Sequence, residues 1–133
     1  MRARPGRPTE GLPKTRRLLR RRDFTRVQGS RAKHRTSHFV LLAAPGTGPH
    51  ERLGIVASRR AGNAVARNRS KRLVREWFRR CAGPRPVDIV VILRPSAHEL
   101  SAERASAELD EARSVALKRL SRQVARAKTA QAS

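Results

Sequence analysis

The chain has 133 residues, of which 32 are lysine or arginine and 10 are aspartate or glutamate, so its formal net charge is +22. That length fits a single domain able to bury a core. The charge is far above the magnitude of about 2–8 that a small domain needs for solubility. Its self-repulsion favours a polyanionic partner and argues against an ordinary small-molecule enzyme. The single cysteine, Cys81, excludes an intramolecular disulfide and a cysteine-based zinc site.

No apolar run approaches the roughly 18–20 residues of a membrane span. The basic N-terminus also lacks the apolar stretch that follows in a secretory signal. We therefore expect a cytoplasmic protein with no membrane partner and no small-molecule substrate. On charge alone, two polyanionic partners remain open: a nucleic acid and an anionic membrane surface.

Composition divides the chain into three parts. Residues 1–15 mix proline and glycine with arginine and predict a disordered basic arm. Residues 16–124 form the ordered body, a single domain. Residues 125–133 are small, polar and basic, and predict a flexible C-terminal tail.

Four short elements are predicted, three of them before residue 60 and the fourth before the last helix. Residues 21–28 favour a helix, because Phe24 and Val27 are three apart among arginines and Gly29 follows as a stop. Residues 37–43 and 52–58 predict strands that pair as a hairpin across the turn at 45–49. Residues 87–93 predict a third strand, apolar on nearly every residue and therefore covered on both faces.

Two longer helices complete the pattern. Residues 64–81 predict a helix with apolar residues on one side and cations on the opposite side. In residues 102–124 apolar residues recur at spacings of three and four after Ser101, a plausible N-cap. The order αββαβα predicts an α/β (α+β) two-layer sandwich with helices on a small mixed sheet.

The sequence indicates no catalytic residue and no metal site. The histidines form no ligand motif, and the acids either cluster at the start of the last helix, where they suit its dipole, or are scattered. No phosphate-binding glycine motif is present. Asp88, inside an apolar strand, is interpreted as a structural hydrogen-bonding group rather than a catalyst.

The basic residues carry the functional signal. Between positions 59 and 80 there are nine cations and one acid, and Arg67, Lys71, Arg75 and Arg79 recur at intervals of four. Like charges at this spacing disfavour an isolated helix, so folding alone does not account for them. They predict a ridge that binds phosphates. Gly62 permits a tight turn before this helix, and Asn63 can cap it.

The stretch SRRAGNAVARNRSKRLVREWFRR resembles the signature of the bacterial ribonuclease P protein subunit, Gly-Asn-Ala-x-x-Arg-Asn-Arg-x-Lys-Arg-x-x-Arg. It matches nine of its fourteen positions, namely Gly62, Asn63, Ala64, Arg67, Asn68, Arg69, Lys71, Arg72 and Arg75. The resemblance extends over roughly residues 16–120. It implies a fold like the ribosomal protein S5 domain 2-like fold, with a left-handed βαβ crossover. General rules alone favour the right-handed form, found in about 98% of such crossovers.

The resemblance also implies a function. The family's protein assists a catalytic RNA that, with Mg²⁺ at the RNA active site, removes the 5′ leader of precursor tRNA. The protein side chains themselves hold no cofactor. By resemblance, the residues that bind the catalytic RNA are Arg59, Arg60, Asn63, Arg67, Asn68, Arg69, Lys71, Arg72 and Arg75.

A groove between the first helix and the sheet would take the leader, lined by Phe24, Gln28, Phe39 and Leu42. Gln28 and Leu42 stand where the family favours aromatic residues, so binding should depend less on base stacking and more on arginine and charge. Phe24 and Phe39 can face either this groove or the core.

Two alternatives remain beside the ribonuclease P subunit. A ribosomal or general RNA-binding structural protein suits the charge equally well, and only the signature between Gly62 and Arg75 separates the two. A DNA-binding regulator is less suited, because a nearly uniform arginine face fits phosphates better than base edges.

Overall fold

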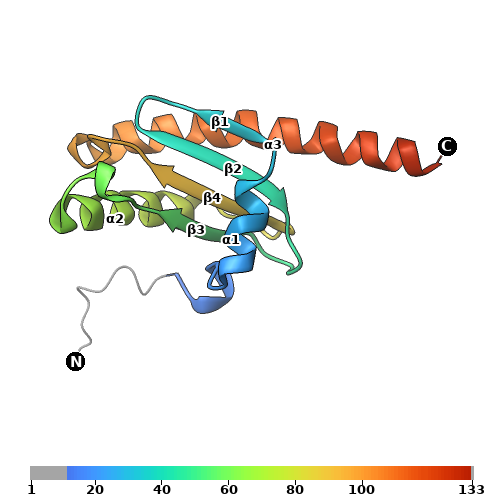
Figure 1. Cartoon of the computed structure of the whole chain (residues 1–133), viewed down its shortest axis with the longest axis horizontal. Coiled ribbons are helices and arrows are strands. Elements are labelled where there is room, and N and C mark those ends of the chain that lie inside the picture. The colour runs from blue at the N-terminus through green and yellow to red at the C-terminus, as the bar shows by residue number, and fades with distance from the viewer. Residues whose placement is uncertain (1–11, 133) are drawn as a thin grey trace.

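The computed structural model describes residues 12–132. Its centre is a four-stranded mixed sheet in the order β1-β2-β4-β3 (Figure 1). β2 pairs antiparallel with both β1 and β4, whereas β3 pairs parallel with β4. The strands are β1 (Lys33–Arg35), β2 (Phe39–Pro45), β3 (Arg52–Val56) and β4 (Val87–Leu93). The helices are η2 (Lys14–Arg16), α1 (Arg21–Gln28), η3 (Arg59–Ala61), α2 (Ala64–Cys81), η4 (Ala97–Glu99) and α3 (Ala102–Ala132).

The predicted two-layer α/β class is confirmed, but the predicted hairpin is wrong. β2 and β3 do not pair, because β4 lies between them and hydrogen-bonds to both. β4 is apolar at six of its seven positions and five of its residues are buried. A strand with two apolar faces is most stable in the middle of a sheet, which separates β2 from β3. The edge strand β1, with the sequence Lys-His-Arg, was not predicted.

The helices cover the two faces of the sheet unequally. α2 and α3 pack side by side on one face and enclose the larger core, which includes Phe39, Leu41, Trp77 and Phe78. On the other face, α1 lies across the sheet (Figure 1) and covers a smaller cluster of Leu18, Val27, Leu42, Ala44 and Val90.

The β3-α2-β4 crossover is left-handed, as the family resemblance implied. In Figure 1 the chain runs along β3, returns through α2 behind the sheet, and enters β4 above β3 in the same direction. The general preference for right-handed crossovers is therefore overridden in this fold.

The structure differs from the predicted boundaries at both ends. Leu12 is buried in the core, so the N-terminal arm predicted over residues 1–15 is too long at its inner end. Residues 1–11 lie outside the described part of the chain. The last helix, predicted to end at 124, continues to Ala132, so the backbone of the predicted tail is helical through most of its length. Within residues 12–132, no helix is both long and apolar enough to span a membrane.

Candidate nucleic-acid interface

The turn that begins α2 is encoded by three neighbouring residues. The Ser58 hydroxyl accepts a hydrogen bond from the Arg60 amide at 3.3 Å, which starts η3. Gly62 then has φ 118°, a conformation that side chains rarely adopt, and a Cβ there would lie 2.8 Å from Cβ of Ala66. The Asn63 side chain caps α2 by accepting from the Ala66 amide at 2.8 Å. The predicted turn and cap are confirmed, and they fix the direction in which the cations of α2 leave the sheet.

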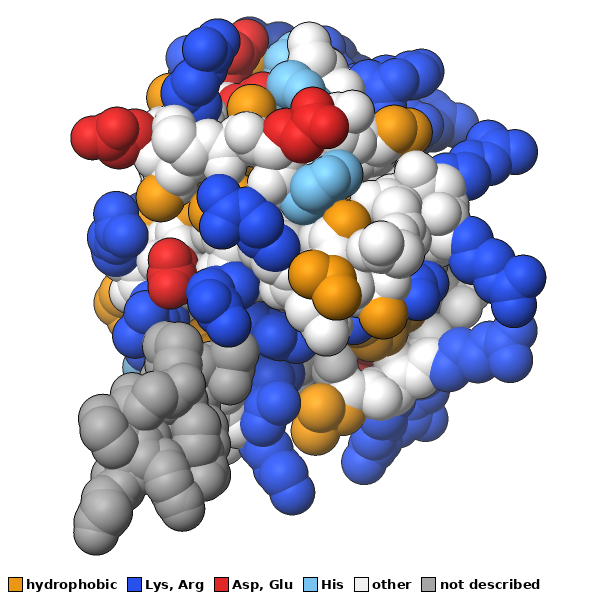
Figure 2. All heavy atoms as spheres, turned by 90° about the vertical axis from the view of Figure 1, so that its left-hand side faces the viewer, with side chains coloured by type: hydrophobic (Ala, Val, Ile, Leu, Met, Phe, Trp, Pro, Cys, Tyr) orange, Lys and Arg blue, Asp and Glu red, His pale blue; other side chains and the backbone are white. Residues whose placement is uncertain are grey.

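The cations of α2 divide into separate groups. Arg72 is exposed on α2, beside the neutral and exposed Asn68, and Arg59 and Arg60 are exposed just before the helix. Figure 2, which faces the end of the molecule where α2 starts, shows lysine and arginine side chains around the outline and only a few acidic ones. This end of the molecule therefore presents positive charge in several directions.

Lys71 and Arg75 turn toward the β3 edge of the sheet. Together with Arg17 they line a hollow beside Phe24 and Gly54. Burial, and then the charge of Arg17, lower the pKa of the Arg75 guanidinium below its usual range. The Nε atom of Arg17 is buried and has no hydrogen-bond partner among residues 12–132. Cations held this close, with an unsatisfied donor, are stabilised when an anion binds between them.

Arg69 has a second role. Its Nε donates to the carbonyl oxygen of His98 at 2.7 Å, and its Nη2 donates to the carbonyl oxygen of Leu100 at 3.2 Å. It therefore ties α2 to the segment that leads into α3. The signature position predicted to bind RNA is thus also a structural contact.

The four residues predicted to line a groove on the α1 face differ in their positions in the structure. Phe24 is half-buried and packs against Gly54 of β3, where a Cβ would be 2.5 Å from Cε1 of its ring. Gln28 is exposed at the end of α1. Leu42 faces this side but is buried under α1.

Phe39 is not a groove residue. It is fully buried in the core under α2 and α3, on the opposite face of the sheet. β2 is apolar at all its positions, so the sequence does not reveal which alternate set faces which side.

Two groove residues were missed by the sequence analysis. Val40 and Ile92 are cross-strand partners, half-buried on the α1 face, and form the floor of a hollow that α1 leaves open. The rim of this hollow includes Lys33, Arg35 and Arg60. The alternation of β2 would have located them had Phe39 been assigned to the core. An apolar floor with a cationic rim suits a single strand, with bases on the floor and phosphates at the rim.

A buried ion pair holds α1 over the sheet. Asp88 on β4 is fully buried, accepts from Arg26 of α1 at 2.5 Å, and accepts from Arg52 at 2.9 and 2.7 Å. Arg26 also donates to the carbonyl oxygen of Pro45 at 2.6 Å. The interpretation of Asp88 as a structural hydrogen-bonding group is confirmed.

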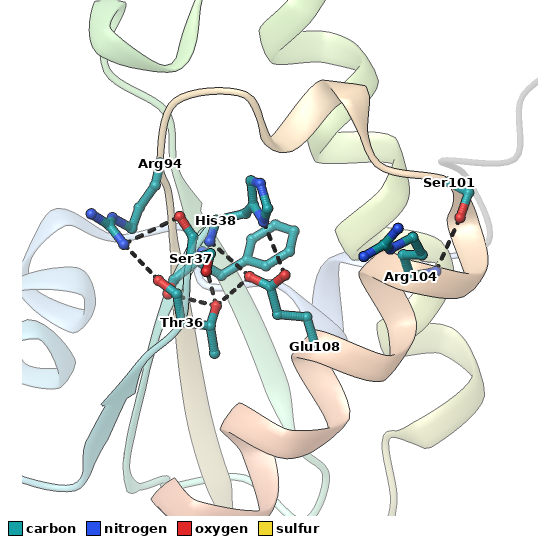
Figure 3. Close-up of polar contacts among 8 residues, drawn as sticks. Thr36, Ser37, His38, Arg94, Ser101, Arg104 and Glu108 are labelled. Carbon is teal, nitrogen blue, oxygen red and sulfur yellow. Dashed lines mark hydrogen bonds and ion pairs between the residues drawn. The ribbon is translucent and has the colours of Figure 1, made fainter.

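The β1–β2 turn is held from two sides at the end of the molecule where α2 and α3 begin (Figure 3). Glu108 of α3 accepts from the Thr36 hydroxyl at 2.5 Å and from the His38 amide at 2.7 Å. Arg94 donates to the carbonyl oxygens of Thr36 and Ser37. These contacts fix the rim of the open hollow. Among residues 12–132 there is no group of three or more His, Cys, Asp or Glu side chains that could hold a metal ion.

A small α/β domain with a cationic strand-turn-helix and a half-open sheet face is typical of basic proteins that bind RNA or other single-stranded nucleic acid. The family model for Ribonuclease P matches residues 12–121, so the chain belongs to the Ribonuclease P protein family.

Comparison with similar proteins supports the same family assignment. The chain is 47% identical over 90 residues to a Ribonuclease P protein component of Syntrophobacter fumaroxidans, covering 65% of this chain and 76% of that protein. It is 40% identical over 93 residues to one from Thermotoga petrophila, covering 68% and 80%. Among solved structures, the RNase P protein of Staphylococcus aureus superposes with a TM-score of 0.65 at 30% identity, covering 77% of this chain and 96% of that one. The RNase P protein of Thermotoga maritima gives 0.62 at 35% identity, covering 71% and 92%.

Proposed function

We propose that this protein acts with a catalytic RNA to remove the 5′ leader of precursor tRNA, and that the RNA, not the protein, breaks the phosphodiester bond. The observation that carries the proposal is the stretch from Gly62 to Arg75, which matches the family signature and presents cations along α2. The RNA would bind the Mg²⁺ ions, and the reaction would take place in the cytoplasm.

The exposed cations around the start of α2 are the catalytic-RNA surface. Arg59, Arg60 and Arg72 are exposed and have no acid paired with them among the described residues. Arginines without a paired acid, before the helix and along its first half, suit phosphates better than base edges. Asn63 contributes through the geometry of the turn, because its side-chain oxygen is already used as the cap.

The α1 face of the sheet is the leader surface. Phe24 offers part of a ring beside Lys71 and Arg75, and the hollow over Val40 and Ile92 continues along the same face. A leader strand that stacks a base on Phe24 would gain about 1–3 kcal/mol. The protein would thereby recognise precursor rather than mature tRNA.

Reconstitution tests this proposal. Purified protein, a bacterial ribonuclease P catalytic RNA and a precursor tRNA are combined at low Mg²⁺, and the 5′ end of the product is mapped. We expect correct cleavage that depends on the RNA and is strongly stimulated by the protein. Cleavage by RNA-free protein, or an RNA that ignores the protein, contradicts the proposal. The alternative of a general RNA-binding structural protein predicts binding without stimulation.

Salt dependence tests the electrostatic part. If about six phosphates are neutralised, the slope of log K against log salt is about −4 to −5, and the affinity falls roughly 10³-fold between 50 and 200 mM salt. Filter binding with the catalytic RNA measures this slope. A flat salt response contradicts a phosphate-binding surface.

A further inference from the structure

The second half of α3 carries more positive charge than the fold uses, since only Arg113, paired with Glu51, and Arg119, bonded to β1, have such contacts within residues 12–132. Residues 112–132 contain six cations and no acid. α3 is 31 residues long, and its C-terminal part extends beyond the ends of the strands (Figure 1). From residue 121 to residue 130 every side chain is exposed except Gln123, which is half-buried.

Four of these cations lie on one side of the helix. At 100° per residue, Lys118, Arg119, Arg122 and Arg126 fall within an arc of about 100° and span about 12 Å along the axis. The intervals 118–122 and 122–126 place like charges one turn apart, which disfavours an isolated helix. All four side chains are exposed. Within residues 12–132 none of the four has an ion pair and only Arg119 has a side-chain hydrogen bond, so the fold does not account for their alignment.

The same positive charge continues onto the edge strand of the sheet. Arg119 donates a hydrogen bond to the carbonyl oxygen of Lys33 on β1, which brings the helix and the strand together. Lys33 and Arg35 are exposed and also stand at the rim of the open hollow. A continuous line of cations therefore runs from the hollow along β1 to the free end of α3.

The position and composition of this surface favour a nucleic-acid backbone over a membrane. Leu120 and Val124, the large apolar residues between positions 118 and 132, lie on the other side of the helix and face Pro45, Pro86 and Val87. The cationic arc has no large apolar side chain to insert into lipid, which membrane-surface helices require. A row of arginines without acids matches the repeating charge of phosphodiesters.

We propose that the distal α3 surface, defined as Lys118, Arg119, Arg122 and Arg126 with Lys33 and Arg35 of β1, is a second RNA-backbone binding surface at the opposite edge of the sheet from α2 and β3. The inference rests on the proposed function, since it adds a second RNA contact to the same ribonucleoprotein. Because β1 and β3 are the two edges of the sheet, the protein would hold RNA on both sides of the leader hollow.

A matched pair of double variants tests the surface. Arg122→Gln with Arg126→Gln removes two charges from the distal α3 surface. Arg80→Gln with Lys128→Gln removes the same charge from positions outside the aligned row, one at the end of α2 and one on the other side of α3. All four positions are exposed, so both proteins should fold, and circular dichroism checks this. Binding is measured to the catalytic RNA, to precursor tRNA and to mature tRNA, each alone and in the assembled complex.

We expect the first double variant to lower the affinity for one of these RNAs at least about fivefold at 0.1 M salt and to reduce the magnitude of the salt slope by about 2. The control should change the slope by less than about 1. The RNA that loses affinity identifies the source of the backbone. Equal effects of the two variants on all three RNAs overturn the proposal.

The failure of this inference and the failure of the proposed function are distinguishable. If Arg72→Gln weakens binding of the catalytic RNA but the distal variant weakens binding of none of the three RNAs, the second surface is wrong and the function stands. If reconstitution yields no stimulation, the function is wrong, while the binding series still decides whether the distal α3 surface contacts RNA.

Site-directed cleavage locates the contact directly. Burial raises the pKa of the Cys81 thiol to about 11, so at pH 7.5 an iron chelate attaches to an engineered cysteine in preference to the native one. Ala125→Cys places the chelate beside Arg122 and Arg126, and Val65→Cys, at a position 78% exposed on α2, is the positive control. We expect hydroxyl-radical cuts at discrete RNA positions from both sites. Cuts from position 65 and none from position 125 overturn the proposal.

Discussion

The two faces of the sheet differ in how completely helices cover them. On one face, α2 and α3 enclose Phe39, Phe78 and Trp77 almost completely. Polar contacts reinforce this face: Trp77 Nε1 donates to Asp110 at 2.8 Å, and Arg113 of α3 bonds the fully buried Glu51 at 2.5 Å. On the other face, a helix of only eight residues covers part of the sheet and leaves Val40 and Ile92 half-exposed.

The contrast shows where a small, highly charged domain obtains its stability. A helix as short as α1 is marginal by itself and depends on tertiary contacts. Its contacts are Val27 in the smaller core and the Arg26–Asp88 ion pair. The closed face therefore maintains the fold, and the half-open face remains available to a ligand. The predictions below test this division.

The largest effect is expected on the closed face. Phe39→Ala should lower the free energy of unfolding by about 3–5 kcal/mol, because it empties a fully buried site. Urea unfolding measures the loss. Phe24→Ala, at the half-buried ring on the open face, should cost less but reduce the preference for precursor over mature tRNA. If Phe39→Ala left stability intact, the assignment of the two faces would be wrong.

The next effect concerns the attachment of α1. Asp88→Asn leaves two guanidinium groups without their buried partner and should cost about 3 kcal/mol. Hydrogen exchange should increase first in α1. Asp23→Asn, which breaks only a 3.4 Å contact to Arg26 at the surface, is the control and should cost below about 1 kcal/mol. Equal losses in the two variants would contradict the role of Asp88 as the anchor.

A smaller, pH-dependent effect is expected at the β1–β2 turn. Burial raises the pKa of Glu108, but hydrogen bonds from Thr36 and His38 oppose this, and the net pKa lies below its usual 4.5. A lowered folded-state pKa contributes stability above pH 4.5 that is lost as the pH falls through the folded value. Glu108→Gln should therefore cost about 1–2 kcal/mol at neutral pH and progressively less in acid. A stability difference that grows in acid would contradict this arrangement.

The smallest effect separates two neighbouring arginines of α2. Arg69→Ala should cost about 1 kcal/mol of stability, because it removes hydrogen bonds to the His98 and Leu100 carbonyls. Arg67→Ala should leave the melting temperature nearly unchanged, since no hydrogen bond or ion pair of its side chain is found in residues 12–132. Both should weaken binding of the catalytic RNA. Calorimetry and filter binding on the same preparations separate the two roles.

Much of the secondary structure could be predicted from the sequence, because local signals are strong. The helices at 21–28 and 64–81 and the strand at 87–93 have the predicted bounds, with Gly62 and Asn63 acting as turn and cap. The pairing of β2 with β4 could not be predicted, since it joins strands about 45 residues apart whose apolar runs carry no register signal.

The candidate site was less predictable than the fold. The positions of Phe39 and Val40 depend on which face of β2 meets the core, and an all-apolar strand leaves this open. The structural role of Arg69 depends on His98, which is 29 residues away in sequence. The bonds of Asp88 to Arg52 likewise join residues 36 positions apart. The distal α3 surface was not predicted because the predicted helix ended at 124 and left Arg126 in the tail, whereas α3 continues to Ala132 and keeps the four cations aligned.

Photocrosslinking tests the division between the two faces most directly. Precursor tRNA carrying 4-thiouridine at single leader positions is assembled with the catalytic RNA and the protein, irradiated, and the attached peptides are identified by mass spectrometry. We expect adducts from α1 and from residues around Val40 and Ile92, on the half-open face. Adducts confined to the helices that cover the opposite face, or none from a leader shown to be bound, would contradict the account.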